Sequence, residues 1–167
     1  MACWAWGTPG VNGRNTDGTN SADFGCIPIA NPSTGGNYLT ELQMASSVNH
    51  THLFFDVLWV NTGIVVTTTT AQTINSVAWP ARDLNGTTNG AGVQIGILVT
   101  TATTNGSAIT NCTMSYTNQD GTAGHTATMA SFPATAVVGS VVWFQLHAGD
   151  TGVRSIQSIT LRRCCSR

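Results

Sequence analysis

The strongest constraint on the fold lies in residues 137–161, where short apolar runs alternate with glycine-rich turns. Residues 141–147 read VVWFQLH, a β-branched and aromatic run that predicts a strand. Residues 148–152, AGDTG, interrupt this run, because their two glycines supply the backbone freedom that a tight turn needs. The next segment is again strand-like, although neither of its faces is uniformly apolar. The region therefore predicts strand, turn and strand, with Asp150 shaping the connection and Arg154 starting the second strand.

The same alternation of extended runs and turns continues along the chain from His52 onward. Thr-rich and aromatic runs favour extended backbone, and the Asn-Gly pair at 105–106 is a hairpin signal between residues 92–104 and 109–117. A further turn at 119–121 leads to a strand that completes a meander. The other predicted strands are 52–60, 64–74, 125–129, 141–147 and the segment from Arg154 to Leu161. Roughly seven or eight short strands at regular spacing predict an all-β fold, a β-sandwich or jelly roll.

The chain divides into two parts by composition. Residues 1–36 predict an extended N-terminal arm, and residues 37–167 predict a single β-sandwich domain that begins with one short helix over 37–48. The helix has Thr40 as its cap and good helix formers after it. The arm carries Trp4, Trp6 and Phe24 without any periodicity. Because exposed tryptophan wastes apolar area, the arm packs either over its own sheet or on a neighbouring subunit, and both alternatives stay open.

Charge is scarce throughout the chain. Only 8% of the residues are charged, against about 25% in ordinary domains. The formal net charge is −1, and the basic residues are six arginines, so no electrostatic footprint for nucleic acid is present. No apolar run reaches the roughly 18 residues that a membrane span needs, and no signal peptide is visible. These features predict no membrane and no nucleic-acid partner, and a protein that stays in the cytoplasm until it assembles.

The candidate chemical groups do not form a recognisable catalytic set. His147 lies near Asp150 as a local turn pair, but no Gly-x-Ser-x-Gly nucleophile accompanies it. The aspartates mostly sit in turns, where their side chains bond the backbone. His50 and His52 share one strand face with Asp56 and could hold a metal ion, although alternate histidines at a strand start are more often surface residues. The sequence predicts no enzyme, no cofactor and no metal site.

Cysteine usage adds little to this picture. An odd number of cysteines cannot pair fully within one chain, and no C-x-x-C motif is present. Free thiols in a reducing cytoplasm are expected, with cross-linking of the Cys164–Cys165 pair to a neighbouring subunit as the alternative. The five cysteines are Cys3, Cys26, Cys112, Cys164 and Cys165.

Four segments carry a resemblance to a known class of proteins. They read LFFDVLWVNTGI, QTINSVAWPARDLNGTTNGAGV, MSYTNQDGTAGHTATM and AGDTGVRSIQSITL, and together they cover roughly residues 53 to 161. In these segments the chain resembles small structural proteins of tailed bacteriophages. The resemblance does not extend to residues 1–36.

The resemblance implies a non-enzymatic virion protein that assembles in the host cytoplasm. A capsid decoration or cement protein is the first expectation, with a homo-oligomer, a trimer by expectation, and the major capsid protein as partners. A tail-fibre or receptor-recognition domain that holds carbohydrate on exposed aromatics is the alternative, as is a tail-tube or connector subunit. The residues assigned to an interface are Trp4, Trp6, Phe24, Arg162 and Arg163.

Overall fold

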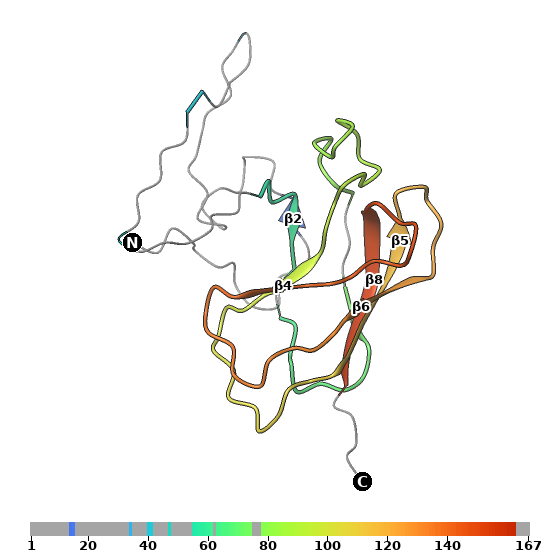
Figure 1. Cartoon of the computed structure of the whole chain (residues 1–167). Helices are drawn as coiled ribbons and strands as arrows, with labels where there is room; N and C mark the ends of the chain where they lie inside the picture. The colour runs from blue at the N-terminus through green and yellow to red at the C-terminus, as the bar shows by residue number, and fades with distance from the viewer. Residues whose placement is uncertain are drawn as a thin grey trace.

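The computed structural model describes residues 14–15, 34, 40–41, 47, 55–61, 63–74 and 78–162 (Figure 1). Within these residues every regular element is a strand and every pairing is antiparallel, so the all-β class is confirmed. The strands are β1 (Arg14–Asn15), β2 (Trp59–Val60), β3 (Gln72–Thr73), β4 (Gly96–Leu98), β5 (Asn111–Asn118), β6 (His125–Met129), β7 (Val141–Trp143) and β8 (Val153–Arg162).

The largest sheet has four strands in the order β3-β8-β5-β6. β5, β6 and β8 lie together at the right of Figure 1, and β4 lies to their left. β5 and β6 form the predicted hairpin around the turn at 119–121, and β6 has the predicted bounds. The hairpin predicted at 105–106 is wrong, because β4 pairs with β7 while β5 pairs with β6 and β8. The Asn-Gly pair turns the chain there, but it does not join two paired strands.

β5 shows the burial pattern expected of a half-buried strand. Cys112, Met114, Tyr116 and Asn118 are buried, and the residues between them are more exposed. The sequence placed Cys112, Met114 and Tyr116 on one face by their period of two, and this placement is confirmed. Cys112 is a free, buried cysteine, and burial raises the pKa of its thiol.

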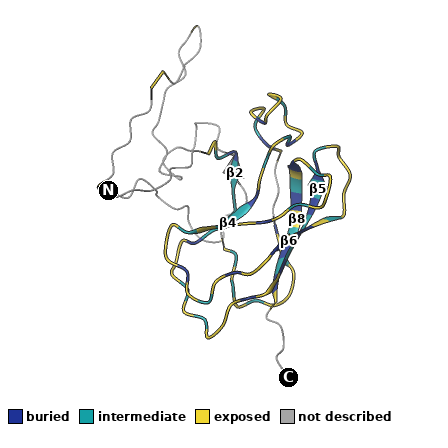
Figure 2. Ribbon diagram, in the orientation of Figure 1, coloured by how far each residue is buried: buried dark blue, intermediate teal, exposed yellow. Residues whose placement is uncertain are grey.

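The pairing of β8 with β5 explains why the β8 sequence shows no clean alternation of apolar and polar residues. Its register against β5 shifts twice, so that Tyr116 faces Ile156 and Asn118 faces Val153. Each shift inserts one extra residue and reverses the parity of the residues beyond it. Val153, Ile156 and Ile159 therefore all reach the buried side although their spacing is three. Figure 2 shows this mixture of buried and exposed positions along β8.

β4 and β7 form a two-stranded sheet, and the chain just beyond β7 pairs with the four-stranded sheet. Beyond β7, Phe144 donates its backbone N–H to the Ile95 carbonyl at 2.9 Å. Gln145 then exchanges two backbone hydrogen bonds with Thr128 of β6, at 2.6 and 2.9 Å. One core lies against both sheets: Ile97 of β4 and Val142 of β7 pack against it as partly buried residues, and its buried members include Leu161 of β8 and, outside the strands, Trp79, Val99, Ile109, Phe132 and Phe144.

Four of the predicted strands are much shorter than expected. The segments 92–104 and 141–147 are strands only at Gly96–Leu98 and Val141–Trp143. Among its described residues, the segment 52–60 is a strand only at Trp59–Val60. The segment 64–74 is a strand only at Gln72–Thr73, because Thr68 donates to the Val65 carbonyl and turns the chain. The Gln72 side chain bonds both backbone groups of Val65, at 2.9 and 3.0 Å, and holds this turn.

The predicted helix and arm lie mostly outside the described residues. Of residues 37–48 the structure describes only Thr40, Glu41 and Ser47, so the helix stays a prediction. Of the arm it describes Thr34 and β1, whose two residues pair with β2 of the same chain. No helix among the described residues is long and apolar enough to cross a membrane.

Candidate functional site

Asp150 lies at the centre of a polar cluster on the turn between β7 and β8. Its backbone N–H donates to the His147 carbonyl at 3.0 Å, which closes the predicted turn. Its side chain, however, is only 6% exposed and points away from that turn. Asp150 thus takes part in the connection through its backbone, as the sequence predicted, while its carboxylate binds residues of the neighbouring hairpin.

Three side chains from β5 and β6 surround the carboxylate. Oδ2 accepts a short hydrogen bond from the Tyr116 hydroxyl and lies 2.7 Å from Nδ1 of His125. Oδ1 accepts a hydrogen bond from the Asn118 amide at 2.9 Å. A carboxylate can be buried at low cost only when its oxygens are paired in this way. The cluster is therefore a fully satisfied polar network.

The β5–β6 hairpin positions the three partners. Tyr116 and Asn118 are two residues apart on the buried face of β5, and His125 is the direct cross-strand partner of Tyr116. The side-chain carbonyl oxygen of Asn118 accepts from the backbone of Asp120 at 3.1 Å and of Thr122 at 2.9 Å. These bonds to the turn orient the Asn118 amide so that its NH₂ group faces Asp150.

His147 completes the cluster from the solvent side. Its backbone N–H donates to the Tyr116 hydroxyl at 3.0 Å, so this hydroxyl binds His147 and Asp150 at once. The imidazole rings of His147 and His125 are 5.2 Å apart between centroids and meet edge to face. The side chains of His125, His147 and Asp150 each offer one donor atom, and these three atoms lie within 4.8 Å of one another.

The network shifts the acidity of its members. Burial would raise the pKa of Asp150, but the hydrogen bonds from Asn118, Tyr116 and His125 outweigh it and hold that pKa below its usual value. Burial, together with the nearby Asp150 carboxylate, raises the pKa of Tyr116 to about 12. At neutral pH the cluster therefore contains a carboxylate and a neutral phenol that donates to it.

The Asp150–His125 pair has the arrangement of a carboxylate that orients a histidine. Such a pair fixes the imidazole tautomer and leaves the other ring nitrogen for a proton or a metal ion. The hydrogen bonds of the described residues join no Ser, Thr or Cys side chain to His125. Together with His147, the pair therefore offers three donor atoms to a ligand or an ion.

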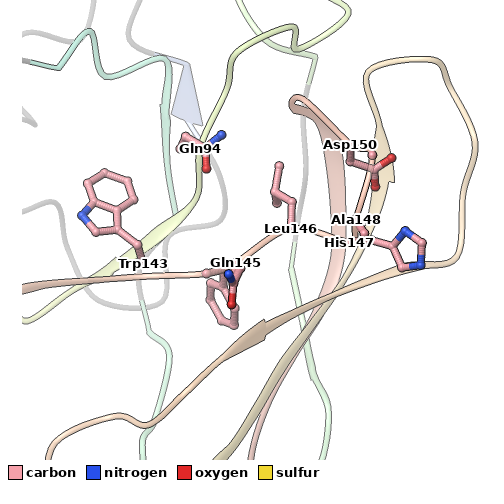
Figure 3. Close-up of a pocket in the computed structure, with 9 residues that line it drawn as sticks. Gln94, Trp143, Gln145, Leu146, His147, Ala148 and Asp150 are labelled. Carbon is pink, nitrogen blue, oxygen red and sulfur yellow. The ribbon is translucent and has the colours of Figure 1, made fainter.

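A shallow hollow of about 570 Å³ lies beside the cluster (Figure 3). Trp143 and Gln94 stand at one end of it, His147 and Asp150 at the other, and Leu146 between them. Trp143 is 41% exposed, and its ring packs on that of Phe55 with centroids 5.0 Å apart. The hollow thus combines an exposed indole with amide, imidazole and carboxylate groups.

The residues that the sequence assigned to an interface are not brought into this cluster. Trp4, Trp6, Phe24 and Arg163 lie outside the described residues. Arg162 is described: it is exposed at the end of β8, and its Nε donates to the Thr69 carbonyl at 3.3 Å. The structure therefore leaves the interface assignment as a prediction.

The group of His50, His52 and Asp56, which the sequence analysis weighed as a metal site and did not predict as one, is only partly described. His50 and His52 lie outside the described residues. Asp56 is exposed, and both of its carboxylate oxygens bind Arg82, at 2.9 and 3.0 Å. Its carboxylate is thus engaged in a two-point ion pair.

The sequence reasoning missed His125 and Tyr116, although a signal for them existed. A hairpin centred on the Asp120-Gly121 pair places Tyr116 opposite His125, and the structure has this register. No local sequence signal could predict that Asp150 contacts Tyr116 and His125. This contact depends on the register between β5 and β8, whose two bulges are not visible in the sequence.

No protein-family model matches this chain, and comparisons with curated proteins and with solved structures give no match either.

Proposed function

We propose that the chain is a non-enzymatic structural protein of a tailed-phage virion, a capsid decoration or cement protein that stabilises the head through contacts between subunits. The observation that supports this proposal is an exposed apolar surface on the β4–β7 sheet. Phe55, Val141 and Trp143 are 56%, 40% and 41% exposed, and Val137 and Val138 extend the exposed apolar area just before β7. Phe55 and Trp143 are in ring contact, and exposed apolar side chains that gather in this way mark interaction sites.

The aromatic pair at the centre of this surface is held in place. A Cβ atom on Gly96 would lie 2.8 Å from Val141 Cγ1 and 2.9 Å from Trp143 Cε3. The missing side chain of Gly96 thus lets the indole lie flat across β4, where its exposed face can meet a partner. Rigid aromatic side chains are frequent anchors of interfaces because they bury a large area at small entropic cost.

The architecture that we propose for the domain is a β-sandwich. The core joins the buried face of β5, β6 and β8 with side chains that flank β4 and β7, as two packed sheets require. In the assembled state we propose a homo-oligomer, a trimer, that binds the major capsid protein. The N-terminal arm over residues 1–36 contributes Trp4 and Trp6 to these contacts, and Arg162 and Arg163 add to them.

The test of this proposal is the copy number of the protein in purified virions, together with its position in a map of the particle. Hundreds of copies spread over the head are expected. Tens to a hundred copies in the tail, or a handful at the fibres, would contradict the decoration role and point to the tail-tube or fibre alternatives. Absence from purified particles would overturn the virion proposal altogether.

The Trp143→Ser variant tests the apolar surface itself. We expect the variant to fold and to bind decoration-free particles at least about tenfold more weakly, because truncating a central aromatic anchor costs more than about 1.4 kcal/mol. Leu84→Ser is the matched control, since Leu84 is 82% exposed and lies on the loop before β4. Equal particle occupancy of the two variants would contradict the proposed docking surface.

A receptor-recognition domain that binds carbohydrate is the second candidate, and the hollow in Figure 3 favours it. An exposed indole beside the exposed amides of Gln94 and Gln145 offers a stacking face and hydrogen-bonding groups to a sugar ring. Titration of host surface glycans, followed by tryptophan fluorescence, separates the two roles. Glycan binding that Trp143→Ser abolishes, with unchanged occupancy on particles, would favour this second function.

A further inference from the structure

We propose that His125, His147 and Asp150 form a binding site for a divalent transition-metal ion of the Zn²⁺ class. This site is separate from the apolar surface of β4 and β7, and it does not depend on the virion role. It is also distinct from the histidine pair near residue 50 that the sequence singled out.

The donor set is the first support. Two imidazole nitrogens and one carboxylate oxygen are ligands that Zn²⁺ and its neighbours in the first transition row bind well. At metal–ligand distances of about 2.1 Å, tetrahedral geometry places two donors about 3.4 Å apart. The three donor atoms already lie within 4.8 Å of one another, so small side-chain rotations suffice to bind an ion. His147 is exposed and can make such a rotation at little cost.

The way in which the donors are held is the second support. The Asp150 side chain is 6% exposed, and Asn118 and Tyr116 fix its two oxygens. The Tyr116 hydroxyl also accepts from the backbone of His147, so one buried phenol positions two of the three ligands. Metal-binding carboxylates characteristically have such outer partners, which orient them and fix their geometry.

The placement of the His147 ring is the third support. Asp150 already has its hydrogen-bond partners without the His147 ring, because His147 joins the network through its backbone N–H. Its ring nevertheless lies 5.2 Å from that of His125, between centroids. At this distance one metal ion can bind a nitrogen of each ring, with both imidazoles in their neutral form.

Binding would put the ion between His125 and Asp150, and the proton on Nδ1 would pass to Nε2 of the same ring, which leaves the imidazole neutral. The hydrogen bond between Nδ1 and Oδ2 is the contact that must open, and Tyr116 and Asn118 keep the carboxylate in place as it does. Three protein ligands leave one coordination position for water or a group from another molecule. Because His147 is exposed, this open position faces solvent.

The experiment is calorimetric titration of the chelator-treated full-length protein with Zn²⁺, followed by Co²⁺ absorption spectra. We expect one ion per chain and a Co²⁺ spectrum of nitrogen and oxygen ligation. His147→Ala should weaken binding by more than about tenfold. Since this residue is exposed, the variant should fold, and Zn²⁺ should raise its melting temperature less than that of the wild type.

Two further variants separate a metal site from a structural network. Tyr116→Phe should lower Zn²⁺ affinity by about ten- to a hundredfold, because it frees both His147 and Asp150 from their common partner. Asp120→Asn is the matched control: this exposed carboxylate lies in the same hairpin turn and, among the residues that the structure describes, accepts from the Gln119 side chain alone, at 2.9 Å. Its Zn²⁺ affinity should equal that of the wild type.

Several outcomes would overturn the proposal. Unchanged Zn²⁺ affinity in His147→Ala would exclude this residue as a ligand. Loss of binding in the His50→Ala/His52→Ala double variant, with His147→Ala unaffected, would place the ion at the other histidine pair. Thiolate-to-cobalt charge transfer in the near ultraviolet would assign the ion to cysteines, and no binding at all would leave the cluster as a structural network only.

Discussion

Asp83 shows how one side chain organises a loop that has no strand pairing of its own. Its carboxylate accepts five hydrogen bonds, from the backbone of Asn85, Thr87, Gly90 and Ala91 and from the Thr87 hydroxyl. This is the role that the sequence assigned to aspartates in turns. Burial would raise the pKa of Asp83, but these bonds outweigh it and lower the pKa to about 2.

The low pKa of Asp83 predicts acid-sensitive stability. Because the folded-state pKa lies below the ordinary value of 3.8, the ionised form stabilises the fold. This contribution is complete above about pH 4 and is lost as the pH falls toward 2. Asp83→Asn should therefore lower the melting temperature at pH 7 and flatten its decline between pH 4 and 2.

Thermal unfolding from pH 7 to pH 2 measures this effect. Asp150, whose pKa is also lowered, acts in the same direction, so part of the acid sensitivity should remain in the variant. Asp120→Asn serves as the control, because its carboxylate bonds only a neighbouring side chain. An Asp83→Asn profile parallel to that of the wild type would contradict the role given to this carboxylate.

The elements are tied together where the loop before β4 meets the start of β8. Gly90 and Gly152 approach so closely that a Cβ atom on Gly90 would lie 1.9 Å from the Val153 oxygen, and one on Gly152 1.9 Å from the Gly90 oxygen. The buried indole of Trp79 donates to the same Val153 oxygen at 2.6 Å. Only two glycines allow the backbones to reach this distance.

Substitution at this contact should separate the two segments. Gly90→Ala and Gly152→Ala should each lower the free energy of unfolding by at least about 3 kcal/mol, because backbone atoms cannot yield as a flexible side chain does. Gly106→Ala is the control, with no atom within 4 Å of the added Cβ, and it should change stability by less than about 0.5 kcal/mol. Urea denaturation compares the three variants, and similar midpoints would refute the close contact.

The strands that the sequence predicted well are those whose pattern is local. β6 and the buried face of β5 follow from a period of two and from the turn at 119–121. The partner of β4 could not be predicted, since it depends on contacts with β7 more than 40 residues away. Which residues of β8 face the core could not be predicted either, because Arg154 and Gln157 are extra residues only relative to the register of β5.

At the scale of the whole molecule, the surface is unusual for a protein that works alone. Charged residues make up 8% of the chain, and the exposed residues include the aromatic pair Phe55 and Trp143. The two edges of the four-stranded sheet leave few backbone groups unpaired among the described residues, because β3 has two residues and Gln145 pairs with part of β6. Side chains, rather than free strand edges, are therefore the groups through which the proposed contacts with neighbours would form.

Oligomerisation should follow from this surface. We expect sedimentation velocity to show a trimer or another closed ring, and the Phe55→Ser/Trp143→Ser double variant to shift the population toward monomer. The reason is that each subunit would lose the aromatic core of an interface that needs more than about 1,000 Å² of buried surface. A wild-type protein that stays monomeric at high concentration would contradict this expectation, and Leu84→Ser provides the control for general surface effects.

The position of β8 in the sheet has a consequence for co-translational folding. β8 lies between β3 and β5, yet a ribosome has synthesised both of them before β8 emerges. Until then β3 has no partner in the sheet, and only the β5–β6 hairpin can form by local contacts. Nascent chains should accordingly remain open to proteases until residues 153–162 have left the exit tunnel, and become resistant in a single late step.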